Sequence, residues 1–100
     1  MRFTFDAELY RWAARKELWT FVDLPEDAAD MIREVVGDQT GGWGSVRVDA
    51  RIGGTEFRTS IFPGGESGTY LLPVKKAVRE AEGLQLGDLV EGVEVELVDF

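Results

Sequence analysis

Two adjacent glycines, Gly53 and Gly54, constrain the fold of this chain more than any other feature of its sequence. They divide residues 45–62 into two segments in which apolar and polar side chains alternate, which is typical of strands with one buried face. A two-residue Gly-Gly loop favours a hairpin, because glycine adopts positive φ without steric cost. The loop fixes the pairs Ile52–Thr55, Arg51–Glu56, Ala50–Phe57, Asp49–Arg58 and Val48–Thr59. Two of these pairs join opposite charges, and a slip of one residue would bury them, so the turn and the pattern predict the same hairpin.

Four more strands are expected outside this hairpin. Alternation and β-forming residues predict strands at residues 2–10, 18–22 and 69–72. A last strand is expected at the C-terminal end, after a turn at residues 84–88. The first two strands are expected to pair with each other because they are neighbours along the chain.

Two short helices are also predicted. The first starts within residues 23–27, where acidic residues and a proline form a helix-start signal, and ends at Gly37. The second runs from Pro73 to about Glu82, where a glycine follows as a natural stop. Its apolar face is expected to hold Val74, Ala77, Val78 and Ala81.

These elements predict a mainly β domain. Neighbouring strands joined by short turns favour an antiparallel sheet. A closed or partly closed barrel of six strands with two short helices protects strand edges better than an open sheet does. The chain has 100 residues, a common domain size, so we expect a single domain over residues 1–100.

The composition excludes several kinds of chemistry. The chain has no Cys and no His, which rules out a thiolate nucleophile, a cysteine or imidazole metal site and a Ser-His-Asp triad. Any catalysis must use carboxylates, Lys, Arg, Tyr or Ser, and we predict no catalytic residue, metal or cofactor. The net charge of −8 disfavours nucleic acid as a partner. No apolar run is long enough to span a membrane or to act as a signal peptide, so we expect a cytoplasmic location.

One candidate binding site combines Lys75, Lys76 and Arg79 on one face of the second helix with Tyr70 and the glycine-rich loop at residues 63–68. Three cations and loop amides are suited to binding a phosphate or another anion. The alternative is a solvated helix face whose charges are balanced by two glutamates of the same helix.

The predicted hairpin carries a second group of candidates. Arg47, Arg51 and Arg58 could form a basic strip on its polar face. The alternative is cross-strand pairing, because the expected register places Asp49 and Glu56 opposite two of these arginines.

Two further candidates are Ser60 and Trp43. Ser60 together with Lys75 could form a Ser-Lys nucleophile, although the sequence has no signature for one. Trp43 lies among glycines, and a tryptophan on such a loop is typical of a recognition residue.

Five blocks of the sequence, in the same order, carry a family resemblance. They are residues 19–25, 44–48, 52–60, 70–79 and 83–90. Together they resemble the bacterial domain-of-unknown-function family DUF1905. The resemblance implies a double-split β-barrel, the architecture of swapped-hairpin transcription factors and antitoxins of the AbrB and MazE kind. The family has no established activity that the resemblance could bring to this chain.

The sequence leaves three functions open. The first is a non-enzymatic binding or interaction module, monomeric or homodimeric, for a small anionic ligand or a protein partner. The second is an AbrB-like DNA-binding regulator, which rests on the implied fold and is opposed by the charge. The third is an enzyme that uses carboxylates or lysine.

Overall fold

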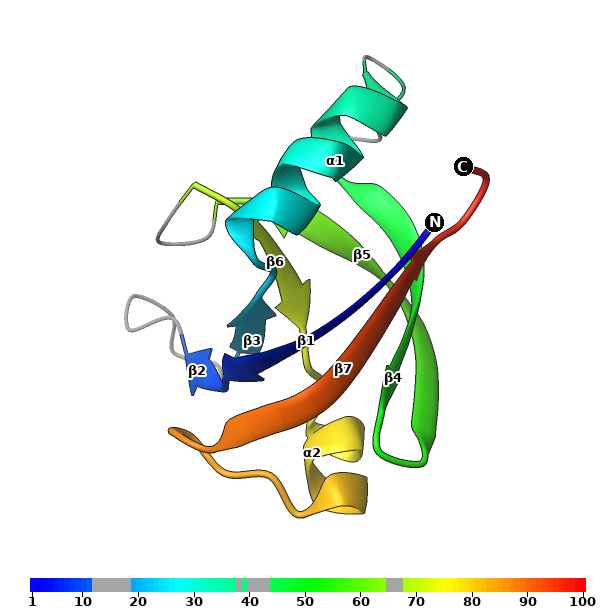
Figure 1. The fold of residues 1–100 in the computed structure, drawn as a ribbon. Helices are drawn as coiled ribbons and strands as arrows, with labels where there is room; N and C mark the ends of the chain where they lie inside the picture. The colour runs from blue at the N-terminus through cyan, green and yellow to red at the C-terminus, as the bar shows by residue number, and fades with distance from the viewer. Residues whose placement is uncertain (12–18, 38, 40–43, 65–67) are drawn as a thin grey trace.

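A single antiparallel sheet of seven strands forms the body of the computed structural model, which describes all residues except 12–18, 38, 40–43 and 65–67 (Figure 1). Within these described residues the strand order is β1-β7-β4-β5-β6-β3-β2. The strands are β1 (Arg2–Glu8), β2 (Tyr10–Arg11), β3 (Thr20–Asp23), β4 (Val46–Ile52), β5 (Thr55–Pro63), β6 (Tyr70–Pro73) and β7 (Leu89–Leu97). The prediction of a mainly β, antiparallel barrel is confirmed.

The sheet curls into a nearly closed barrel at Leu9. β1 and β2 stand at opposite ends of the strand order, yet only Leu9 separates them in the chain. The Leu9 amide donates to the Asp88 carbonyl (2.9 Å), and its carbonyl accepts from the Gly87 amide (2.8 Å). The Leu9 side chain is fully buried. The first predicted strand therefore divides in two, which gives seven strands in place of six.

The β4–β5 hairpin has the predicted register. Every pair expected from the Gly53–Gly54 loop is present. The four inward-facing residues of β4 are buried, so the strand supplies one wall of the core. Gly53 has a φ of 59°, whereas the second glycine does not need positive φ.

The two helices lie at opposite ends of the barrel (Figure 1). Helix α1 (Glu26–Val36) ends at Gly37, as predicted, and buries Ala28, Ala29, Ile32 and Val36. Helix α2 (Lys76–Glu82) begins three residues later than predicted. Neither has the length and apolar character that a membrane-spanning helix needs, in the part of the chain that the structure describes.

Two expectations about neighbouring segments are wrong. The long first strand, β1, pairs with β7, and only the short β2 pairs with β3. The reason is barrel closure, since the first strand must complete the sheet beside the last. Pro73 ends β6 opposite Phe21 and does not open α2, because the φ that proline fixes is also compatible with extended backbone at the end of a strand. With this later start, Ala77 and Ala81 are exposed and only Val78 of α2 is buried.

Candidate functional site

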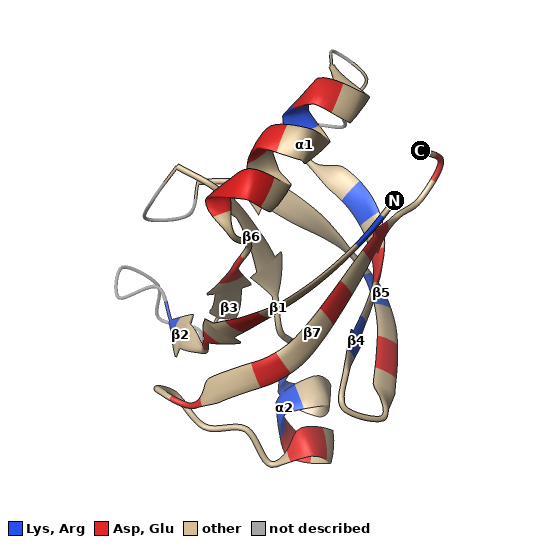
Figure 2. Cartoon of the chain, in the orientation of Figure 1, with Lys and Arg blue, Asp and Glu red and all other residues tan. Residues whose placement is uncertain are grey.

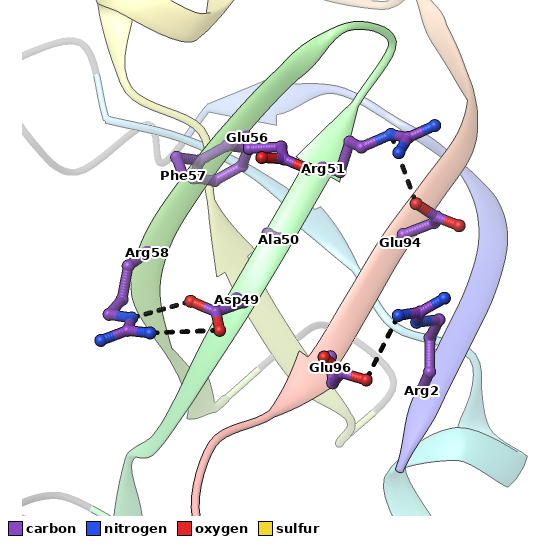
Figure 3. Close-up of a pocket in the computed structure, with 9 residues that line it drawn as sticks. All are labelled: Arg2, Asp49, Ala50, Arg51, Glu56, Phe57, Arg58, Glu94 and Glu96. Atoms are coloured by element: carbon purple, nitrogen blue, oxygen red, sulfur yellow. Dashed lines mark hydrogen bonds and ion pairs between the residues drawn. The ribbon is translucent and has the colours of Figure 1, made fainter.

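The outer face of β1, β7, β4 and β5 carries an open groove of about 520 Å³ (Figure 3). We call it the sheet-face groove. Its lining residues are Arg2, Asp49, Ala50, Arg51, Glu56, Phe57, Arg58, Glu94 and Glu96. The charged members come from the outward positions of the four strands, because successive side chains of a strand point to opposite faces.

The strand register aligns four of these charges in one row. Arg2 stands opposite Glu96, Glu96 opposite Asp49, and Asp49 opposite Arg58. Arg58 Nε and Nη2 donate to the two carboxylate oxygens of Asp49 at 2.7 and 3.3 Å. At the other end of the row, Arg2 Nη2 lies 3.4 Å from Glu96 Oε2. Each arginine of the row therefore has its own carboxylate.

The Asp49–Arg58 pair also shifts the ionisation of both groups. The hydrogen bond from Arg58 is the main cause that lowers the pKa of Asp49 below its ordinary value, and the nearby positive charges act in the same direction. The same hydrogen bond raises the pKa of Arg58. Both side chains are about half exposed, so the pair neutralises the surface more than it stabilises the fold.

Arg51 supplies the third paired arginine of the groove. Its Nε lies 3.4 Å from Glu94 Oε2 on β7, although the hairpin register also places it opposite Glu56. All three arginines that line the sheet-face groove thus have carboxylate partners. Cross-strand pairing accounts for Arg51 and Arg58, and the sheet face does not present a free basic strip there.

A second groove, of about 570 Å³, lies beside α2, and we call it the α2-end groove. It is lined by Lys76, Arg79, Glu80, Gly83, Leu84 and Gln85. Gly83 ends the helix in the left-handed conformation, and the Leu84 amide donates to the Arg79 carbonyl (2.9 Å). Asp88 holds the following turn by accepting from the Gln85 amide (2.8 Å). The groove residues that follow the helix are therefore held by hydrogen bonds from their backbone amides.

The cations of α2 differ from those of the sheet face. Arg79 is partly buried, and its Nε is buried without a hydrogen-bond partner among the described residues. Lys75, at the helix start, is exposed and makes no ion pair within the same set of residues. Lys76 Nζ lies 3.8 Å from Glu80 Oε1, and both side chains are largely exposed. Helix α2 carries basic and acidic residues together (Figure 2), but Lys75 and Arg79 form no ion pair among the residues that the structure describes.

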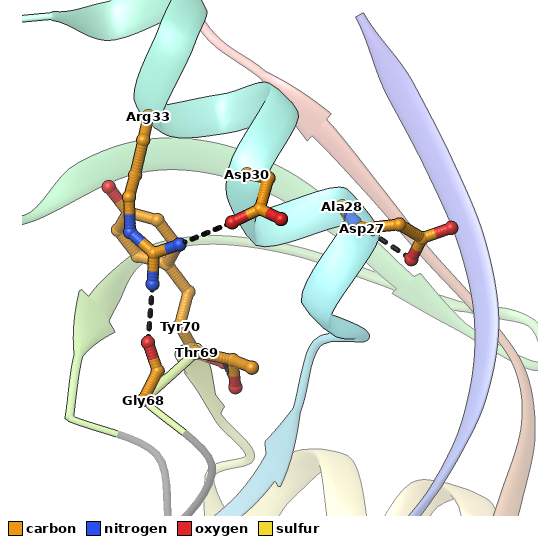
Figure 4. A network of polar contacts seen from close by, with 7 residues as sticks. All are labelled: Asp27, Ala28, Asp30, Arg33, Gly68, Thr69 and Tyr70. Carbon is orange, nitrogen blue, oxygen red and sulfur yellow. Dashed lines mark hydrogen bonds and ion pairs between the residues drawn. The ribbon is translucent and has the colours of Figure 1, made fainter.

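Tyr70 does not join these cations, which corrects the predicted grouping. It is buried at the end of β6 near α1, with the Arg33 guanidinium over its ring at 5.7 Å (Figure 4). Arg33 also pairs with Asp30 (2.9 Å) and donates to the Gly68 carbonyl. Because β6 is extended, its two ends reach opposite ends of the barrel, and α2 follows only after the far one.

The remaining candidates lie elsewhere. Ser60 stands on β5 opposite Arg47, whereas Lys75 stands at the start of α2, so the structure does not bring the two together as a nucleophilic pair. Trp43 lies outside the described residues. No group of three or more Asp or Glu side chains in the described part of the chain is arranged to hold a metal ion.

Sequence reasoning missed part of each groove. It did not place Arg2, Glu94 and Glu96 beside the hairpin, because the pairing of β1 with β7 joins the two ends of the chain. It also read residues 84–88 only as a turn and not as a groove wall. The signal for the first set was present in the outward positions of both strands, but nothing local shows that these strands are neighbours.

The chain matches the model of the family described as Domain of unknown function (DUF1905) over residues 5–95. This match covers most of the chain, and the chain belongs to this family. No curated protein matches the chain.

Proposed function

We propose that this member of the DUF1905 family is a binding module for a small anion, such as a phosphate or carboxylate compound, which it holds in the α2-end groove. The observation that carries the proposal is the buried Arg79 Nε, which has no acceptor among the described residues. A buried charged donor without an acceptor is costly, and an anion in the adjacent groove would supply one.

The chemistry of arginine suits this ligand class. Its planar guanidinium presents donors in a fork that matches carboxylate and phosphate oxygens. Arg79 is partly buried, which restricts its side chain and limits the entropy lost on binding. Arg79 would therefore be the anchor of the site.

The two lysines would supply further charge. Lys76 has a long, exposed contact with Glu80, and contacts of this kind contribute little. An anion could attract Lys76 away from Glu80 at small cost. Lys75, one residue earlier, adds to the local positive potential, although the protein as a whole carries a net charge of −8.

The other two functions receive less support. A DNA-binding surface conflicts with the acidic residues along the outer faces of β1 and β7 (Figure 2), which would repel a polyanion. Enzymatic activity would have to operate without His or Cys, which the chain lacks. Binding alone is enough to explain a groove beside the Arg79 Nε, which has no partner among the described residues.

An NMR titration tests the proposal. Inorganic phosphate and pyrophosphate are added to the labelled protein, with sodium chloride of equal ionic strength as the reference. We expect saturable shifts of the amides of Gly83, Leu84 and Gln85. Arg79→Gln should weaken binding about tenfold or more, equal to at least about 1.4 kcal/mol.

Arg58→Gln is the matched control because it removes an arginine that already has a carboxylate partner. It should leave the affinity unchanged. Circular dichroism confirms that both variants fold. Shifts no larger than those caused by chloride, or equal losses in the two variants, would reject the α2-end groove as an anion site.

A further inference from the structure

Strand β1 has one edge that pairs with no other strand among the described residues. It stands at the end of the sheet order, and its ladder partner is β7. The Leu97 amide donates to the Met1 carbonyl (3.0 Å), which identifies Met1 and Leu97 as a hydrogen-bonded pair. Such pairs alternate along an antiparallel ladder, so Phe3 and Phe5 also bond to β7. The N–H and C=O groups of Arg2, Thr4 and Asp6 then point away from β7.

This edge has charged side chains but lacks three other common protections against pairing. Natural edge strands are often blunted by proline, lysine or a bulge in the edge strand itself. β1 contains no proline and no lysine, and the bulge near Asp6 adds its extra residue to β7, where Gly92 has a φ of 64°. Arg2, Thr4 and Asp6 are all exposed.

We propose that this edge pairs with the same edge of a second copy of the chain, antiparallel and centred on Thr4. Thr4 then stands opposite Thr4 of the second copy, and Arg2 stands opposite Asp6. This register uses the outward backbone groups of Arg2, Thr4 and Asp6 in about six hydrogen bonds between the copies. The two barrels become one dimer with a continuous sheet across the twofold axis.

The side chains of residues 2–6 complement themselves in this register. Two Arg2–Asp6 pairs would join opposite charges on the outer face, and Phe3 would stand opposite Phe5 on the inner face. Within each copy Arg2 contacts Glu96 at 3.4 Å and Asp6 Oδ1 accepts from the Gly92 amide, so these pairs would use the other guanidinium N–H groups and the second carboxylate oxygen. A register centred on Arg2 or on Asp6 would instead place like charges face to face. The net charge of −8 on each copy opposes association, so the dimer should tighten as salt is raised from low ionic strength.

Proline at position 4 tests the pairing with little damage to the monomer. The Thr4 N–H points away from β7, so Thr4→Pro removes a donor only from the free edge. Thr4→Val keeps that donor and is the matched control. By sedimentation equilibrium we expect a dimer for the unmodified protein and for Thr4→Val, and a monomer for Thr4→Pro. A monomer for the unmodified protein at all concentrations, or a dimer that persists in a folded Thr4→Pro variant, would overturn the proposal.

Charge reversal gives a second test that does not depend on proline. Arg2→Asp and Asp6→Arg each place like charges opposite each other, and each should raise the dimer dissociation constant about tenfold. The double variant restores opposite charges and should recover most of the loss. Equal affinities in all four proteins would show that these residues do not face each other, and would overturn the register.

Discussion

The sheet-face groove and the α2-end groove are both lined by arginine, but only the arginines of the sheet-face groove have carboxylate partners among the described residues. On the sheet, strand register places a carboxylate opposite each lining arginine, as Asp49 shows for Arg58. On α2, Arg79 has a buried Nε without a partner among the described residues. The cross-strand ladder thus neutralises its own arginines, whereas the Nε of the α2 arginine keeps no partner within the described chain.

The two regions also touch, at the tip of the hairpin. Thr55 Oγ1 donates to Glu82 Oε2 (2.6 Å), and a Cβ on Gly53 would lie 1.9 Å from Glu82 Oε1. Glu82 is the last residue of α2. The hairpin that carries Arg51 and Arg58, both paired, therefore also contacts the end of the helix that carries Arg79.

Breaking this contact should have the largest effect. Gly53→Ala places a side chain at a φ of 59° and displaces Glu82, so we expect a loss of about 2–3 kcal/mol in the free energy of unfolding. Gly54→Ala meets open space and does not need positive φ, so its stability should be nearly unchanged. Urea denaturation measures both, and equal losses would contradict the role of Glu82 and of Gly53.

Adding a carboxylate to the α2-end groove should neutralise Arg79, as carboxylates neutralise the arginines of the sheet face. Gln85→Glu places an acid in the groove that Arg79 lines, and pyrophosphate affinity should fall about tenfold. Gln39→Glu adds the same charge just beyond α1 and should have a much smaller effect. Isothermal titration calorimetry compares the two. A similar loss in both would assign the effect to net charge and not to the groove.

Removing a carboxylate from the sheet face should leave an arginine there without its ionic partner, just as Arg79 on α2 has none among the described residues. Asp49→Asn takes away the ionic partner of Arg58, so weak phosphate binding should appear there, at about millimolar affinity. Nearby Glu96 limits the gain. Chemical shifts of Arg58 Nε–H during a phosphate titration report the site. An Arg58 signal that stays unresponsive in this variant would show that the carboxylate is not what prevents binding.

The smallest expected effect is on the acid titration of Asp49. Its pKa lies below the ordinary value of 3.8, because the charged form is bonded to Arg58. The pair's contribution to stability is therefore complete above that value and is lost as pH falls through the lower pKa of the folded state. Carbon-13 NMR of the side-chain carboxyl should show the low midpoint, and Arg58→Gln should return it toward 3.8. An unchanged midpoint would mean that Arg58 does not cause the shift.

Local chemistry determined which features could be predicted from the sequence. The hairpin register follows from two glycines and the alternation beside them, and the end of α1 follows from Gly37. The start of α2 differs from the prediction because Pro73 suits both a helix start and the last, extended residue of a strand.

Features that depend on distant parts of the chain could not be predicted in this way. The pairing of β1 with β7, and hence the row from Arg2 to Arg58, joins the two ends of the sequence. Tyr70 is close to the α2 cations in the sequence, but β6 places it beside Arg33 at the other end of the barrel.

Arginine Nε–H signals of the unmodified protein, followed during a pyrophosphate titration, test the central comparison most directly. We predict that the Arg79 signal moves and saturates while those of Arg2, Arg51 and Arg58 stay in place. Movement of the sheet-face signals together with Arg79, or an Arg79 signal that does not respond, would contradict it.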